Sequence, residues 1–497
     1  MTRAVPLLSG SRVVTVPADE VDVVLHPPPP PAHVVDVEAA VRDALAFPLS
    51  GEPLDRIARK GMRSTVVVEP PALPLPGAQF DPRPLALATV LDALGALGVE
   101  DEDVTILVAG GLQRRVGRRE LERLLPPQRA RTFRGKVVVH DAADPGLVPM
   151  GSGETRIHPH VLDAKLVVVV SSAETILAGG PGALVAACDA ASIRATAGLR
   201  SLVQASGEPA WRFALDVEQS VAERVAVLGV SLVLDHPRLT GSFRLYPHDP
   251  QSLDHVVRSP FRRLYSLLPA AARRSVLGDL GRTLSATAVF AGRPSVAHAE
   301  ALVRAVELRG TRLDEPVDAL VVGVPWIGPH VPREPLNPIT SAAVALGLAL
   351  RQWRDAFPVV DGGTLVLVHS LTRSFAHTAH DPYRRLFDAL RAGGEEAAAE
   401  AEPAARADER ALAAYRAGRA CHPLLPFAVW AGCRPALDRL GRVIVAGSRD
   451  AVAARALGFV PSHSVSSALE MTHGVAGGRA RVGVLLAPPY APLLLGP

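Results

Sequence analysis

Charged side chains follow two apolar runs of this chain, at the points where each run ends. Glu69 comes directly after the run 64–68, Glu174 comes shortly after the run 166–170, and Arg114 lies in a turn between them. If the runs are strands of one parallel sheet, their carboxyl ends share an edge where ligand sites are commonly built. Two carboxylates and a guanidinium there predict a polar or anion-binding site. The alternative is that they are solvated loop charges, because carboxylates are mostly exposed.

A glycine-rich turn follows the second of these runs. The sequence passes from Ser171 and Ser172 to Gly179-Gly180-Pro181-Gly182 and then to an apolar stretch over 183–187. A strand, a glycine turn and a helix start are the parts from which ligand sites of α/β sheets are made. The alternative is an ordinary strand-to-helix connection whose glycines serve chain geometry only.

Histidines offer weaker candidates for metal binding. His158 and His160 point the same way if that segment is extended, but two ligands do not make a site. His377 and His380 follow a run that ends at His369 and lie one helical turn apart if the segment is helical, with a solvated polar turn as the alternative. His140 and Asp141 are neighbours that a strand would direct to opposite faces.

The remaining pattern alternates short apolar runs with helical stretches, which predicts a doubly wound α/β fold with parallel sheets. The predicted strands of the first half are 64–68, 104–109, 136–140, 166–170 and 230–235, and its helices are 35–46, 54–60, 85–97, 118–125 and 217–228; a long helix over 298–308 is expected to bridge the halves. The second half has predicted strands 319–323, 364–369, 443–446 and 482–485, and helices 340–353 and 466–471. A helical segment over 389–416 is expected at the surface.

The chain of 497 residues is too long for one core, and its length indicates two or three domains. Residues 1–34 are predicted to be an N-terminal extension that ends in a stiff proline run, 35–287 the first domain with an insertion at about 237–285, and 288–497 the second. Strands ending at Glu69, Gly110 and Ser171 would face one crevice.

Charge and cysteine content exclude several classes of protein. The formal net charge is only +3 and the arginines are dispersed, which argues against a nucleic-acid partner. Three cysteines without paired spacing indicate neither a disulfide framework nor a zinc ribbon, and Cys188, in an alanine-rich stretch, is expected to be a small buried residue. No apolar run of membrane-spanning length or signal-peptide type is present. We therefore expect a cytoplasmic protein with no membrane partner.

Several of these segments, taken in order, resemble the nickel-pincer lactate racemases and their relatives. The resemblance runs from about residue 35 to the end. It is carried by the segments Ala44-Leu45-Ala46-Phe47-Pro48-Leu49, Leu107-Val108-Ala109-Gly110-Gly111-Leu112-Gln113-Arg114, His140-Asp141, 151–160, Ala178-Gly179-Gly180-Pro181-Gly182, Ala288-Val289-Phe290-Ala291-Gly292-Arg293-Pro294 with His298, and 317–321.

This resemblance implies two α/β domains with an active site in the cleft between them. In the family, a nickel ion sits in a pyridinium-derived pincer cofactor that is tethered to a lysine, and this cofactor accepts a hydride from a 2-hydroxy acid and returns it to either face. Two histidines exchange the roles of base and acid, as imidazole can near neutral pH. By resemblance, Glu69, the residue at position 73, Arg114, Gly179 and Gly182 are the predicted substrate-binding positions.

The chain departs from the family at its central positions. Leu73 stands where an arginine is expected, Gln113 at the first catalytic histidine, and Glu174-Thr175 where a proline and the second histidine are expected. The lysine position falls near Val185, and the sequence has no lysine after Lys165. Neither Gln113 nor Thr175 titrates near neutral pH, so neither is a general base.

Two functions follow for the same fold. The first is a racemase or epimerase of a small 2-hydroxy acid, with Gln113, Glu174 and Thr175 at the catalytic positions and altered chemistry. The second is a non-catalytic paralogue that binds a small anionic ligand, such as a carboxylate, or a protein partner. The cofactor is not predictable from the sequence, and the nickel-pincer nucleotide is not expected at Val185.

Overall fold

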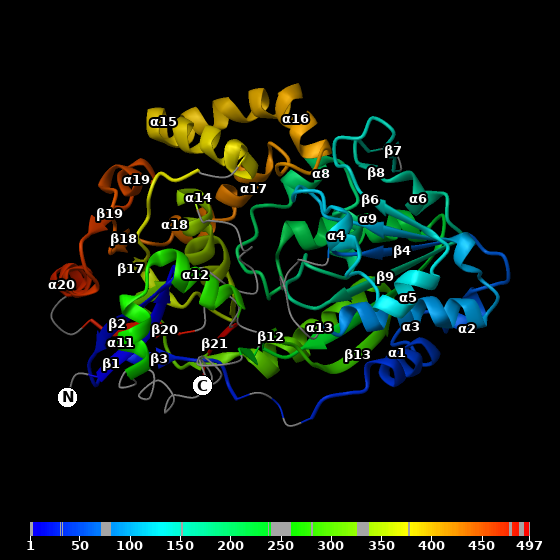
Figure 1. Ribbon diagram of the computed structural model, residues 1–497, viewed down its shortest axis with the longest axis horizontal. Coiled ribbons are helices and arrows are strands. Elements are labelled where there is room, and N and C mark those ends of the chain that lie inside the picture. The colour runs from blue at the N-terminus through cyan, green and yellow to red at the C-terminus, as the bar shows by residue number, and fades with distance from the viewer. Residues whose placement is uncertain are drawn as a thin grey trace.

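The computed structural model describes residues 3–29, 31, 33–70, 81–150, 153–236, 238–239, 260–279, 282–325, 337–375, 378–476, 480–486 and 492–496. Leu73 and His377 of the predicted site lie outside these ranges. The chain forms two lobes, each built around a six-stranded sheet with helices packed on it (Figure 1). The predicted fold class, mixed α/β with mostly parallel sheets, is confirmed.

The first lobe contains a sheet whose strand order is β13-β10-β9-β4-β5-β6. All neighbours are parallel except β13 and β10. Apolar side chains fill both faces of its central strands, as parallel sheets covered by helices require. The strands are β4 (Ser64–Val68), β5 (Val104–Val108), β6 (Lys136–Val139), β9 (Leu166–Ser172), β10 (Ala226–Leu234) and β13 (Ala286–Gly292).

The chain reverses direction across this sheet at one place. It runs from β4 outward to β5 and then β6, returns to β9 on the other side of β4, and continues outward to β10. The strands β9, β4 and β5 are therefore parallel neighbours, and the predicted strand ends near Ser171, Glu69 and Gly110 lie at the same edge. The reversal point is between β4 and β9.

Helices cover both faces of the first sheet. They are α1 (Val37–Ala46), α2 (Leu54–Ile57), α3 (Arg83–Ala96), α4 (Arg118–Leu121), α5 (Pro127–Thr132), α6 (Pro159–Leu162), α7 (Pro181–Val185), α8 (Ala190–Ala195), α9 (Pro209–Ala222) and α13 (Pro294–Arg309), with the 3-10 turn η1 (Asp101–Asp103).

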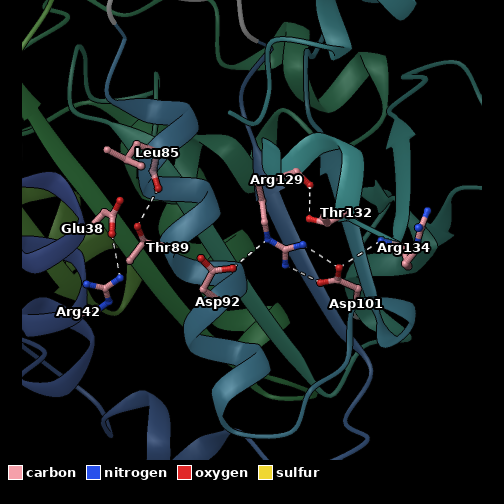
Figure 2. Close-up of polar contacts among 9 residues, drawn as sticks. All are labelled: Glu38, Arg42, Leu85, Thr89, Asp92, Asp101, Arg129, Thr132 and Arg134. Carbon is pink, nitrogen blue, oxygen red and sulfur yellow. Dashed lines mark hydrogen bonds and ion pairs between the residues drawn. The ribbon is translucent and has the colours of Figure 1, made fainter. Parts of the chain in front are cut away.

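An arginine on α5 connects this helix to its neighbours. The Arg129 guanidinium lies 3.0 Å from Asp92 of α3 and donates two hydrogen bonds to Asp101 of η1 (Figure 2). These bonds lower the pKa of the Asp101 carboxyl.

The second lobe is built on a fully parallel sheet of order β19-β18-β17-β15-β20-β3. Its strands are β3 (Val23–Leu25), β15 (Val317–Gly323), β17 (Val359–Val368), β18 (Arg442–Ala446), β19 (Val460–Ser462) and β20 (Val482–Leu485). Its helices are α14 (Pro338–Ala342), continued by a π turn (Ala343–Leu348) and a 3-10 turn (Ala349–Arg351), η5 (Thr378–His380), α15 (Asp381–Arg406), α16 (Glu409–Arg416), α17 (Leu425–Ala431), α18 (Arg434–Leu437), α19 (Ala451–Ala456) and α20 (Val465–Ala476).

Short strands complete the architecture outside the two main sheets. The pairs are β1 (Arg3–Ser9) with β2 (Arg12–Ala18), β7 (Val148–Pro149) with β8 (Arg156–Ile157), and β11 (Arg238–Leu239) with β12 (Arg282–Thr283). A three-stranded sheet joins β14 (Thr311–Leu313), β21 (Leu493–Leu495) and β16 (Trp353–Arg354).

The N-terminal residues pack with the second lobe, although they precede the first. The β1–β2 hairpin shares an apolar core with β15, β17, β18 and β20, and β3 pairs directly with β20 (Figure 1). Helices α11 (Pro260–Leu267) and α12 (Ala270–Asp279), within the predicted insertion, contribute Tyr265 and Leu277 to the same core. The predicted domains are continuous stretches of the chain, whereas the second lobe also includes residues from the N-terminal extension and the insertion. The predicted boundaries therefore stay a prediction.

Two helical segments differ from the expectation. The helix predicted over 217–228 ends at Ala222, because Ala226–Leu234 pairs with β9 as a strand. The prediction extended too far because the spacing of the apolar residues at 217, 221, 225 and 228 also suits a helix. The segment 389–416 was expected at the surface. It belongs to α15 and α16, and α15 buries Leu390, Ala398 and Ala405 in the second-lobe core.

Candidate functional site

The glycine turn after β9 is shaped around one histidine. The Gly180 N–H donates a hydrogen bond to Ser171 Oγ at 2.9 Å. Gly179 and Gly180 have φ of +106° and +51°, and a Cβ on Gly180 would lie 2.3 Å from the Cβ of His298. A Cβ on Gly182 would lie 2.1 Å from the Leu177 carbonyl oxygen. Close packing therefore accounts for these glycines, and their substrate-binding role stays a prediction.

His298 itself has a structural environment. It lies on α13 and is fully buried, and its Nε2 donates to the Thr175 carbonyl oxygen at 2.8 Å while its Nδ1 lies 3.4 Å from Ser231 Oγ. Burial lowers its pKa to about 4, despite the opposing effect of the Thr175 hydrogen bond. The ring is therefore neutral at pH 7. The Thr175 hydroxyl, at a predicted catalytic position, accepts the Ala178 N–H at 3.0 Å.

Glu174 forms a buried ion pair with the last residue of α13. Its Oε2 lies 2.5 Å from Arg309 Nη1, and the two side chains are 1% and 4% exposed. Arg309 also donates to the carbonyl oxygens of Ala173, at 3.2 Å, and Ala305, at 3.3 Å. The other oxygen of Glu174, Oε1, is buried and has no hydrogen-bond partner among the residues that the structure describes.

Glu69 follows β4 on the adjacent strand. Burial raises the pKa of its carboxyl to about 7; the charge of Arg83 and the Ser172 N–H lower it, and the charge of Glu174 raises it. Arg83, at the start of α3, donates to both carboxylate oxygens of Asp81. Glu69 Oε2 is buried and, within the described ranges, has no hydrogen-bond partner. A carboxyl with this pKa exchanges a proton near neutral pH.

The turn after β5 is covered by the second lobe. The Tyr415 hydroxyl of α16 donates to the Gly111 carbonyl oxygen and accepts the Ala142 N–H, both at 3.2 Å. The His422 N–H donates to the Leu112 carbonyl oxygen at 2.9 Å. Leu112 and Ala142 belong to the apolar core of the second lobe. The second lobe thus contacts this strand end directly.

Gln113 and Arg114 lie on the same covered turn. Arg114 forms an ion pair with Glu120 at 2.6 Å and donates to the Gly418 carbonyl oxygen at 3.4 Å. Gln113 is exposed, and its N–H closes the turn on the Gly110 carbonyl oxygen. Arg114 therefore contacts both lobes, whereas Glu69 and Glu174 lie at the β4–β9 edge.

The residues around Val185 do not fit a lysine-tethered cofactor. Val185 is 3% exposed and packs in an apolar cluster under α7 and α9. The three lysines of the chain, Lys60, Lys136 and Lys165, are exposed and lie before or at the start of β4, β6 and β9. They are at the amino edge of the sheet, a strand length of roughly 15–20 Å from the carboxyl edge.

The histidine pairs have local partners. His140 Nε2 donates to the Cys188 carbonyl oxygen at 2.8 Å, and burial lowers its pKa to about 3. The His160 N–H donates to His158 Nδ1 at 3.3 Å at the start of α6, and the pKa of His158 is lowered to about 4, mainly by burial. Cys188 is buried, as expected, and burial raises the pKa of its thiol.

In the second lobe, His369 and His380 are both buried, and burial lowers the pKa of His369 to about 4. The Leu371 N–H donates to His369 Nδ1. In the described part of the chain, no group of three or more His, Cys, Asp or Glu side chains is arranged to hold a metal ion.

Comparisons with known proteins identify the class to which this architecture belongs. The whole chain aligns with the lactate racemase apoprotein from Thermoanaerobacterium thermosaccharolyticum, with 13% identity, a TM-score of 0.59, and coverage of 99% of this chain and 100% of that one. This likeness shows a lactate racemase fold. A Thermotoga maritima protein of a structural genomics programme matches at 12% identity over 92% of this chain and 97% of that one, with a TM-score of 0.47.

The sequence comparison is more specific. Residues 9–180 match the family model of the lactate racemase N-terminal domain, and no curated protein sequence matches the chain. Residues 9–180 are thus similar to a lactate racemase N-terminal domain, and the resemblance inferred from the sequence is confirmed. Among the described helices, none has both the length and the apolar character needed to cross a bilayer.

Proposed function

We propose that this protein is a lactate racemase relative that binds a small polar molecule at the carboxyl edge of its first sheet and does not carry out the family's lysine-tethered hydride transfer. The observation that supports this proposal is the environment of Val185. At Val185, which the resemblance assigns to the family's lysine position, the chain has an apolar side chain enclosed in a core, and the three lysines lie at the opposite edge of the sheet. Gln113 and Thr175 supply no imidazole at the histidine positions.

The ligand site of this proposal is the β4–β9 edge. The turn after β5 is covered by Tyr415 and His422, whereas Glu69 and Glu174 keep buried oxygens that lack hydrogen-bond partners in the described residues. Buried polar atoms are nearly always paired, so unpaired ones at a strand edge favour a ligand role.

One observation favours a second candidate, a racemase or epimerase of a small 2-hydroxy acid with altered chemistry. The Glu69 carboxyl has a pKa of about 7, which suits a general base or acid at neutral pH. In this alternative, Glu69 does the proton transfer that histidines do in the family.

Intact mass and metal analysis of protein purified from its native host test the proposal, together with an assay of lactate racemisation. We expect the unmodified mass of the chain, no stoichiometric nickel and no racemisation. Stoichiometric nickel with a covalent adduct would overturn the proposal. Racemisation without nickel that is lost in Glu69→Gln but kept in the control Glu218→Gln, a buried glutamate on α9, would favour the second candidate.

A further inference from the structure

The unpaired oxygens lie at the one place in the first sheet where the chain reverses direction. From β4 the chain proceeds to β5 and β6 on one side, and it returns to β9 and β10 on the other. Ligands of open α/β sheets bind outside the carboxyl ends of the strands at such a reversal. Glu69 follows β4 directly, while Ser172 ends β9 and Glu174 follows it, so these residues flank the reversal point.

Three oxygen atoms at this point have no hydrogen-bond partner among the described residues. They are Glu69 Oε2, Ser172 Oγ and Glu174 Oε1, and each is buried. Ser172 and Glu174 are 0% and 3% exposed. Buried polar atoms are nearly always hydrogen-bonded, so three unpaired ones at the ends of two adjacent strands are unusual in a native protein. A ligand that donates hydrogen bonds would satisfy them together.

The charged side chains at this edge determine which charge a ligand there should carry. Both cations are already engaged, Arg83 with Asp81 and Arg309 with Glu174. Three carboxylates (Glu69, Asp81 and Glu174) against two guanidinium groups leave one formal negative charge. The unpaired atoms are oxygens, and the two carboxylate ones accept only. An anionic ligand would therefore meet excess negative charge.

We propose that this edge binds a small monocation that donates hydrogen bonds, an ammonium ion or a primary amine, through Glu69, Ser172 and Glu174. This inference rests on the proposed function, which places the ligand site at the same edge. Ammonium nitrogen offers three or four donors for the three oxygens, and its charge balances the edge. A metal ion that needs several protein ligands is a poorer occupant, because no group of three or more His, Cys, Asp or Glu side chains in the described ranges is arranged to hold one.

Cation and proton compete for the same carboxyl. Glu69 is faced by Arg83 of α3, by Ser172 and Glu174 at the end of β9, and through Glu174 by Arg309 of α13. Because the Glu69 pKa is about 7, the neutral acid predominates below pH 7 and has no charge to attract the cation. Binding is expected to weaken about tenfold per pH unit below 7 and to level off above it.

Titration calorimetry with ammonium chloride and methylammonium chloride at pH 8 tests this inference on the full chain. Sodium chloride and tetramethylammonium chloride at equal ionic strength supply the charge without N–H donors, and sodium lactate supplies the anion. We expect saturable binding of the two N–H donors only. Glu69→Gln should abolish it, since the charge is lost and an amide donor is introduced, and Glu218→Gln should leave it unchanged.

Ser172→Ala keeps every charge and removes one acceptor, so it is expected to weaken methylammonium binding severalfold even if Glu69→Gln does not fold. Equal responses to ammonium and tetramethylammonium, or none to either, would overturn the inference. Binding of lactate without ammonium would overturn the cation assignment and leave the proposed binding function standing. Nickel and an adduct in native protein would remove the proposed function independently of these titrations.

Discussion

Replacing Arg309 by methionine tests how much the buried ion pair with Glu174 contributes to the free energy of unfolding. The two side chains are 4% and 1% exposed, and their closest atoms are 2.5 Å apart. The substitution also removes the bonds from Arg309 to the Ala173 and Ala305 carbonyl oxygens. Removing one partner leaves the other as an uncompensated buried charge, which costs roughly 3–5 kcal/mol. We expect a loss of that size in the free energy of unfolding.

Urea denaturation at pH 7.5, followed by circular dichroism, measures this loss. Arg304→Met is the matched control, because Arg304 lies on the same helix, is 60% exposed and pairs with the exposed Glu300 and Glu307. Such surface pairs contribute below about 1 kcal/mol. The double variant Glu174→Gln with Arg309→Met should recover much of the loss, since no charge is left unpaired. Equal costs for Arg309→Met and Arg304→Met would refute the reasoning.

Three further predictions concern other parts of the molecule. Tyr415→Phe removes two hydrogen bonds between the lobes and should lower the free energy of unfolding by roughly 1–2 kcal/mol; an unchanged urea midpoint would contradict it. Gly180→Ala places a Cβ against His298 at positive φ and should destabilise by roughly 2–5 kcal/mol in the same assay, whereas Gly198→Ala, which has open space, should not. Because the folded-state pKa values of His140, His158 and His298 are about 3, 4 and 4, below the unfolded value of ~6.5, stability should hold above pH 6.5 and fall as pH drops below it. The raised pKa of Glu69 has the opposite effect, because it favours the folded state at lower pH, but the loss from three histidines exceeds the gain from one carboxyl. A urea midpoint that is higher at pH 4.5 than at pH 6.5 would contradict this prediction.

The sequence predicted the central strands well because their composition is unambiguous. The run 64–68 forms β4 with the same bounds, and 166–170 forms most of β9. Strands buried on both faces need continuous apolar residues, and these runs end where polar residues begin. The helix predicted over 217–228 was wrong at its C-terminal end, because the apolar spacing of 217, 221, 225 and 228 suits a helix while tertiary pairing takes 226–234 into the sheet.

The candidate site was partly predictable. The sequence placed Glu69 and Glu174 at neighbouring strand ends, and the structure brings them to one edge. It gave no sign that Arg114 would be engaged by Glu120 and Gly418, since Gly418 is 304 positions away in the chain. Arg309, the partner of Glu174, was also missed. An arginine at the end of a long helix resembles a surface residue, and only tertiary contacts reveal that it is buried.

The packing of the N-terminal hairpin has a consequence for how the chain folds during synthesis. The hairpin packs on strands of the second lobe, and Val23 and Val24 of β3, which follows it, pair with Gly483 and Val484 of β20, so these N-terminal strands must wait for strands made much later. The first sheet, by contrast, is complete once the ribosome has passed Gly292. Contacts so distant in sequence form slowly, and until they form, the apolar face of the hairpin is exposed. The second lobe is therefore expected to complete its sheet last, and loss of β20 should release β3 as well.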